Sequence, residues 1–113
     1  MMTRTPRPRG EGAEFLAGGE RESLGDELSR GYYIQPTLLK GNNKMRVFQE
    51  EIFGPVMQLL KFKDLDDAIK RANNTIYGLA AGVCTRDVGT ALHCANALQA
   101  GTVWVNCYDN FDM

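Results

Sequence analysis

The sequence predicts an α/β fold in which parallel strands alternate with crossover helices, and two features indicate it. Strand-length apolar runs recur at 55–62, 79–85 and 102–106, and such runs are typical of parallel strands that are covered on both faces. Each gap between them carries a helical pattern that begins at an aspartate, Asp64 or Asp87, a residue type favoured at helix N-caps. The order β-α-β-α-β therefore predicts a mostly parallel sheet with helices packed over it.

Both expected helices show an apolar face. After Asp64, acidic residues occupy the first turn and basic residues the last, which suits the helix dipole, and the apolar stripe is formed by Leu65, Ala68, Ile69 and Ala72. The helix after Asp87 is expected to bury Val88, Ala91, Leu92, Ala95 and Leu98. Gly101 is expected to supply its left-handed stop.

The first half of the chain is less regular. A short strand is expected at 13–17, followed by a glycine-rich and charged surface excursion at 18–31. Residues 32–40 predict an irregular strand, because Pro36 lacks a ladder donor and belongs at an edge or bulge. Residues 45–51 predict one or two helical turns that end before Gly54.

Composition excludes several classes of partner. The chain has 113 residues, 43% of them hydrophobic, and a formal net charge of −1, so no field of one sign is expected to attract nucleic acid or an acidic membrane. No apolar signal-peptide core follows Met1, so a cytoplasmic location is the default expectation. Three cysteines without close pairing predict reduced thiols and neither a disulfide framework nor a metal site.

The residues at 1–10 contain arginines and two prolines but no acid and no apolar period, so a disordered basic lead-in is expected there. A basic targeting helix is the weaker alternative, because two prolines in ten residues oppose it. The predicted domain then runs from 11 to 113.

Four short sequence motifs resemble those of a known protein family. The run Gln49–Val56, QEEIFGPV, closely resembles the Glu-Ile-Phe-Gly-Pro signature of the aldehyde dehydrogenase superfamily. Residues 31–37, 72–79 and 100–106 also resemble that family, in family order and spacing. The resemblance covers the chain from about Gly10 to Cys107, and it implies that 11–113 is an incomplete catalytic domain of such an enzyme.

The family joins a dinucleotide-binding domain, a catalytic domain and a small oligomerisation arm, so the resemblance implies a homo-oligomeric parent. In the family mechanism a cysteine thiolate attacks the aldehyde, hydride passes to NAD or NADP, and a glutamate-activated water hydrolyses the thioester. Both catalytic groups belong to segments that would precede Glu11, and no glycine-rich turn after a strand is present here. The resemblance therefore implies a chain that is inactive by itself.

The resemblance places the edge of the cofactor site at Glu51 and Phe53. A carboxylate accepts from two donors, which suits the vicinal hydroxyls of the nicotinamide ribose. If the segment is extended, Phe53 points the same way as Glu51 and offers an apolar face to the nicotinamide ring. The alternative from the residues alone is a solvated acidic pair, Glu50 and Glu51, that ends a short helix, with Phe53 in the core.

Other candidates receive structural interpretations. Cys107 with Asn106 and His93 can be assembled into a thiol-hydrolase constellation, but the family nucleophile lies in another motif. The remaining expectations are a buried Cys84, a Cys94 beside the buried helix face, an exposed or capping His93 and a core Trp104. Asn106 is a weaker candidate for lining a crevice, because it ends a strand where open α/β sheets collect ligands.

Two functional hypotheses follow. The first is a fragment of an NAD(P)-dependent aldehyde dehydrogenase that converts aldehydes to carboxylic acids. The second is a non-catalytic polypeptide that associates with full-length dehydrogenase subunits through unpaired strand edges and uncovered apolar faces.

Overall fold

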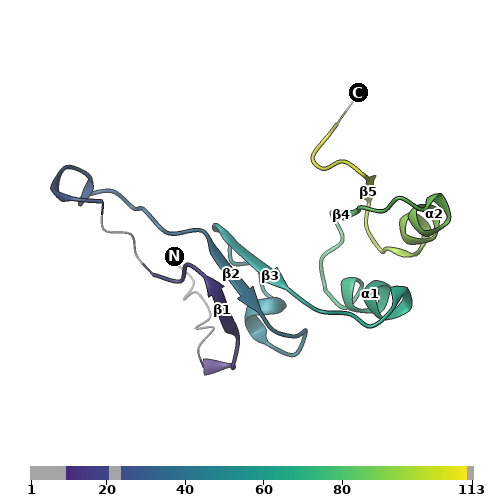
Figure 1. Ribbon diagram of the computed structural model, residues 1–113, viewed down its shortest axis with the longest axis horizontal. Helices are drawn as coiled ribbons and strands as arrows, with labels where there is room; N and C mark the ends of the chain where they lie inside the picture. The colour runs from purple at the N-terminus through teal and green to yellow at the C-terminus, as the bar shows by residue number, and fades with distance from the viewer. Residues whose placement is uncertain (1–9, 21–23, 112–113) are drawn as a thin grey trace. The chain divides into compact units, whose positions relative to one another are not determined.

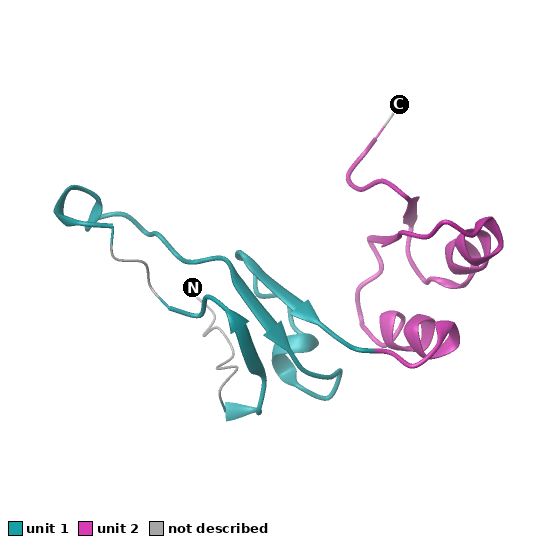
Figure 2. Ribbon diagram, viewed as in Figure 1, with its two compact units in different colours: residues 1–61 teal, residues 62–113 magenta. Residues whose placement is uncertain are grey.

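The computed structural model of the protein describes residues 10–20 and 24–111. The chain divides into two compact units, residues 1–61 and 62–113 (Figure 2). Each unit has its own small β-sheet (Figure 1). The predicted lead-in at 1–10 lies, except for Gly10, outside the described residues.

The first unit is built on a three-stranded sheet in the order β1-β2-β3. β1 (Glu14–Ala17) runs antiparallel to β2 (Thr37–Lys40), and β2 runs parallel to β3 (Val56–Leu59). The strand predicted at 13–17 is confirmed as β1. The one predicted at 32–40 is confirmed only from Thr37, whose N–H donates to the Pro55 carbonyl at 2.8 Å, while Pro36 lies just outside the ladder because it has no N–H to donate.

The described connections of this unit include the 3-10 helices η2 (Asp26–Leu28) and η3 (Arg46–Phe48). η3 links β2 to β3 and confirms the helical turn predicted after 45. It supplies Val47, which is fully buried together with Leu39 of β2. Around these two the core also contains Ala13, with Phe15, Met45, Phe48, Ile52 and Val56 packed against it.

The predicted burial of the strand after Pro55 is wrong on one face. The apolar run 55–62 was expected to be covered on both faces, but β3 ends the sheet order and leaves Met57 62% and Leu59 41% exposed. Val56 and Gln58 lie on its half-buried side. Within the described residues of the first unit, no helix or strand covers this face of β3, although its apolar sequence is typical of a strand covered on both sides.

The second unit contains α1 (Leu65–Ala72), β4 (Ala80–Val83), α2 (Val88–Ala97) and β5 (Thr102–Val105). β4 and β5 pair in parallel, with Ala80 opposite Thr102 and Val83 opposite Val105. The α/β class and the parallel β-α-β arrangement are therefore confirmed. One continuous sheet is not: β3 pairs with β2, whereas β4 pairs with β5 in a separate sheet.

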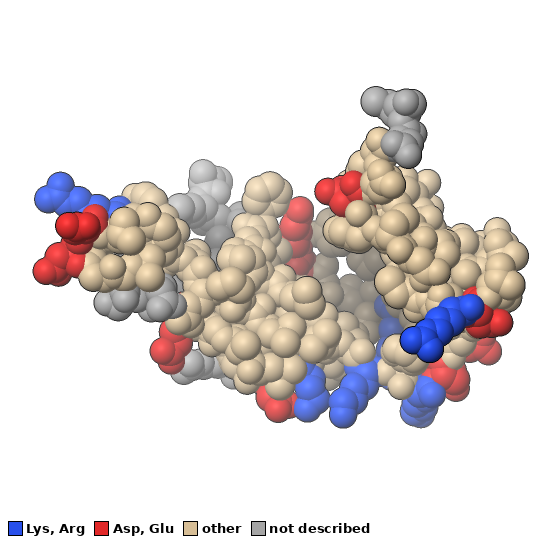
Figure 3. Space-filling view, turned by 45° about the horizontal axis from the view of Figure 1, so that its top comes forward, with Lys and Arg blue, Asp and Glu red and all other residues tan. Residues whose placement is uncertain are grey.

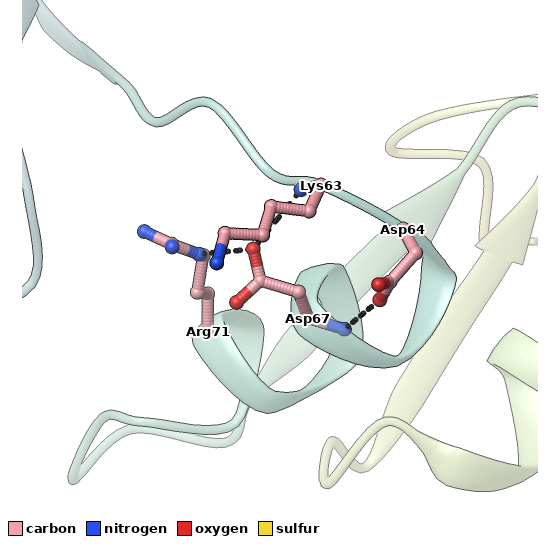
Figure 4. Close-up of polar contacts among 4 residues, drawn as sticks. All are labelled: Lys63, Asp64, Asp67 and Arg71. Carbon is pink, nitrogen blue, oxygen red and sulfur yellow. Dashed lines mark hydrogen bonds and ion pairs between the residues drawn. The ribbon is translucent and has the colours of Figure 1, made fainter.

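Aspartate caps begin both α-helices, as predicted. The Asp64 carboxylate accepts from the Asp67 N–H at 2.8 Å, and the Asp87 carboxylate accepts from the Thr90 N–H at 2.6 Å. Figure 4 shows that Asp67 also accepts from Arg71 Nε at 2.8 Å and from the Lys63 N–H at 3.0 Å. The first turn of α1 is thereby tied both to its last turn and to the residue before its cap.

The buried face of α2 differs from the predicted one. Ala91 and Cys94 are buried, whereas Val88 and Leu92 are largely exposed. The two buried residues have small side chains, which allow the helix to approach the two strands closely. The predicted left-handed conformation is also wrong for Gly101, which is not among the glycines with positive φ.

The remaining surface is mixed in charge. Figure 3 shows acidic and basic side chains close to one another on the face that it draws. Within 10–20 and 24–111, no helix has the length and apolar character needed to cross a bilayer.

Candidate functional site

The predicted cofactor residues lie in a segment between η3 and β3, residues 51–55, that belongs to neither a helix nor a strand. Glu51 and Phe53 are both exposed, while Ile52 between them packs on the Leu39 and Val47 core. This burial pattern contradicts the alternative in which Phe53 is a core residue. It also makes both predicted side chains accessible to a ligand.

The upstream end of the 51–55 segment is anchored on η3. The Glu50 N–H donates to the Arg46 carbonyl at 2.9 Å, and Arg46 Nε donates to the Glu50 carboxylate at 2.6 Å. This hydrogen bond and ion pair lower the pKa of Glu50 and raise the pKa of Arg46. The Glu50 side chain is thus held against η3.

The downstream end is anchored on the sheet. The Pro55 carbonyl accepts from the Thr37 N–H, and the Gly54 carbonyl accepts from the Val56 N–H at 2.7 Å. From Val56 onward the chain is paired with β2. The segment is therefore held between two fixed flanks.

Phe53 has an unusual backbone. Its φ is 51° and its side chain is 92% exposed. The prediction that the segment is extended is therefore wrong at Phe53. The alternation of side chains along an extended strand then does not determine whether Glu51 and Phe53 point the same way. A bulky side chain in the left-handed region costs about 1–2 kcal/mol, and such strained residues cluster at ligand-binding and active sites.

Asn106 lies in the second unit, directly after β5, with a φ of 55°. Its N–H donates to the Val83 carbonyl at 2.9 Å, and its side-chain carbonyl accepts from the Thr85 N–H at 2.9 Å. Asn106 therefore ties together the carboxyl ends of β4 and β5. This contact gives it a structural function at the place where a crevice-lining residue was predicted.

The other candidates are also located. Trp104 is 8% exposed and Cys94 is buried, as predicted, but Cys84 is exposed because it follows β4 rather than lying in it. Cys107 is exposed, and His93 is exposed with Nε2 4.0 Å from a carboxylate oxygen of Asp66. Over the described ranges, no cluster of three or more His, Cys, Asp or Glu side chains has the arrangement of a metal site.

Among the described residues, hollows occur away from these side chains in both units. One of about 480 Å³ in the first unit is lined by Phe15, Gly19, Glu20, Tyr32, Tyr33, Ile34 and Thr37. A smaller one of about 170 Å³ lies in the second unit between the exit of α1 and the residues after α2. Neither of these two hollows is lined by Glu51 or Phe53, which lie on an exposed segment of the chain.

Sequence reasoning missed Gln58. Its side-chain amide donates to the Val47 carbonyl at 3.1 Å and so joins β3 to η3. A signal was present, because Gln58 is the polar residue of β3 and shares the half-buried side of the strand with Val56.

These features define an α/β chain with a strained, exposed turn at Phe53 and an exposed apolar face on β3. Residues 5–113 match the family model described as aldehyde dehydrogenase family. The chain belongs to the aldehyde dehydrogenase family.

Relatives agree with this assignment. The chain is 59% identical over 100 residues to a probable aldehyde dehydrogenase of Streptomyces coelicolor. The matched region covers 88% of this chain and 20% of that protein. The chain thus spans about a fifth of the length of that curated relative. Among solved structures, HpcC of Thermus thermophilus is 47% identical with a TM-score of 0.88, covering 93% of this chain and 21% of that one.

A second solved structure carries a ligand. Betaine aldehyde dehydrogenase of Staphylococcus aureus, in complex with NAD+, is 40% identical with a TM-score of 0.85 and covers 91% of this chain and 20% of that one.

Proposed function

We propose that this chain is the C-terminal part of the catalytic domain of an NAD(P)-dependent aldehyde dehydrogenase that oxidises aldehydes to carboxylic acids. The family match over residues 5–113 carries the proposal. The complex of a solved relative with NAD+ supports the choice of cofactor. The resemblance implies a homo-oligomeric parent enzyme, and the formal net charge of −1 gives no field that would attract nucleic acid or an acidic membrane.

Within that enzyme, Glu51 and Phe53 contribute to the cofactor site. The exposed carboxylate of Glu51 is suited to accept hydrogen bonds from the ribose hydroxyls, and the exposed ring of Phe53 offers an apolar face to the nicotinamide. When bound, the cofactor supplies a hydride acceptor. The strained backbone at Phe53 supports this assignment, since a cost of that kind is retained where a site requires it.

The assignment is tested in the full-length dehydrogenase. Glu51→Gln is expected to raise the KM for the nicotinamide cofactor about tenfold, because a neutral amide with one acceptor oxygen replaces a charged acceptor with two. Phe53→Leu is expected to raise this KM less. Glu50→Gln is the matched control, since Glu50 is engaged with Arg46. If the Glu50 and Glu51 variants have equal cofactor KM values, the assignment of Glu51 to the cofactor site is wrong.

The chain by itself is proposed to be inactive, because the resemblance places the nucleophilic cysteine and the catalytic glutamate of the family in segments that would precede Glu11. Purified chain is incubated with a panel of aldehydes and NAD or NADP while absorbance of the reduced cofactor is followed. No sustained turnover is expected, and turnover above the rate of the buffer alone contradicts this part of the proposal.

A second function is favoured by one observation, the uncovered face of β3 with Met57 and Leu59 exposed. An apolar strand face of this kind supports association with full-length dehydrogenase subunits. Size-exclusion chromatography of the chain mixed with intact enzyme tests it. A complex of defined stoichiometry supports this function, and separate elution of the two components opposes it.

A further inference from the structure

Gln58 closes a loop around the candidate cofactor residues. Its Nε2 donates to the carbonyl oxygen of Val47 at 3.1 Å. Val47 belongs to η3 and is fully buried, while Gln58 belongs to β3 and is paired in register with the fully buried Leu39. Both ends of the hydrogen bond are therefore fixed by the core of the first unit.

Between these two residues the chain leaves η3, passes through the 51–55 segment and enters β3. Because that segment has no helix or strand of its own, its position depends on how its two flanks are held. Gln58 links those flanks directly. The left-handed φ of Phe53 makes this dependence stronger, since a strained backbone persists only where the surrounding structure holds it.

We propose that Gln58 is a positioning residue for the cofactor site: its hydrogen bond to Val47 holds Glu51 and Phe53 in the geometry that binds the nicotinamide end of NAD(P). This inference rests on the proposed function of those two residues. Gln58 acts through Glu51 and Phe53 and need not touch the cofactor itself.

The experiment uses the full-length dehydrogenase that contains this chain. Gln58→Met keeps the length of the side chain and removes its N–H donors, and it is expected to raise the KM for the cofactor about fivefold, the factor typical of one lost hydrogen bond, with a smaller change in kcat. Gln58→Lys restores a donor on an unbranched side chain and is expected to recover most of the loss. In a Glu51→Gln background, Gln58→Met is expected to raise the cofactor KM by a smaller factor. The reason is that the contact of Glu51 with the cofactor, which Gln58 is proposed to position, is already weakened.

Asn73→Ala is the matched control, because Asn73 also donates from a side-chain amide to a backbone carbonyl, that of Ala97 at 2.8 Å, but in the second unit. It is expected to lower the Tm and leave the cofactor KM unchanged. If Glu51→Gln raises the cofactor KM and Gln58→Met behaves like Asn73→Ala, the positioning role is overturned while the proposed function stands. If neither Glu51→Gln nor Phe53→Leu changes the cofactor KM, the proposed function fails, and the positioning role fails with it.

Discussion

Asn73 and Gln99 are joined by a hydrogen bond across 26 positions of the chain: the side-chain carbonyl of Asn73 accepts from the Gln99 N–H at 2.9 Å. The same side chain donates to the Ala97 carbonyl. Asn73 is the C-cap of α1, so one amide connects the end of α1 to the end of α2 and the entry to β5.

Asn73→Ala is therefore expected to destabilise the second unit by about 2 kcal/mol, since two hydrogen bonds are lost. Hydrogen exchange measured by mass spectrometry over residues 65–105 checks this, and faster exchange is expected in both α1 and β5. Exchange that changes in α1 alone would contradict a connecting role for this side chain.

Asp67 makes stability depend on pH. Hydrogen bonds from Arg71 and from the Lys63 N–H lower the pKa of Asp67 from its ordinary value of 3.8. Because the folded pKa lies below the unfolded one, this stabilisation is present above pH 3.8 and is lost as the pH falls through the folded value.

Asp67→Asn is accordingly expected to lower the Tm at neutral pH, and the difference from wild type is expected to shrink below pH 3.8. Thermal unfolding followed by circular dichroism across the pH range measures it. Asp66→Asn is the matched control, because the Asp66 side chain lies in the same turn but is 95% exposed. If the Tm difference between Asp67→Asn and wild type is the same at every pH, Asp67 is not the source of a pH-dependent stability.

Phe53 provides a test of backbone strain. Glycine adopts a φ of 51° without steric cost, whereas alanine keeps the steric cost of this backbone conformation. Both substitutions remove the exposed ring, so the comparison isolates the backbone. Phe53→Gly is therefore expected to be more stable than Phe53→Ala by about 1 kcal/mol in urea unfolding. Equal stabilities would show that the left-handed conformation is not strained here.

Trp104 is the centre of the packing after β5. Its Nε1 donates to the Asn110 carbonyl at 3.0 Å, and its ring lies 5.1 Å from that of Tyr108 and 5.2 Å from that of Phe111, between centroids. Trp104→Ala is expected to cost about 3 kcal/mol or more, and Trp104→Phe distinctly less, because the ring packing is partly kept. Urea unfolding followed by far-UV circular dichroism compares the two, and equal losses would show that ring packing contributes little.

The local elements could be predicted because their signals lie within a few neighbouring residues. The caps at Asp64 and Asp87 depend on a carboxylate and an N–H three positions later. The strand after Pro55 and the parallel pair β4 and β5 follow from apolar runs of strand length. The family itself could be recognised from the Gln49–Val56 motif, since its residues are contiguous.

Only the tertiary structure decided which faces are buried and how the candidate site is held. Burial depends on neighbours that are distant along the chain, so an apolar pattern did not reveal that Met57 and Leu92 are exposed. The left-handed φ of Phe53 and the bond from Gln58 to Val47 arise where η3 and β3 meet on one core. The sequence by itself determined the family, the elements and the two candidate side chains; the fold determined their backbone geometry and their support, because both come from contacts between separate segments of the chain.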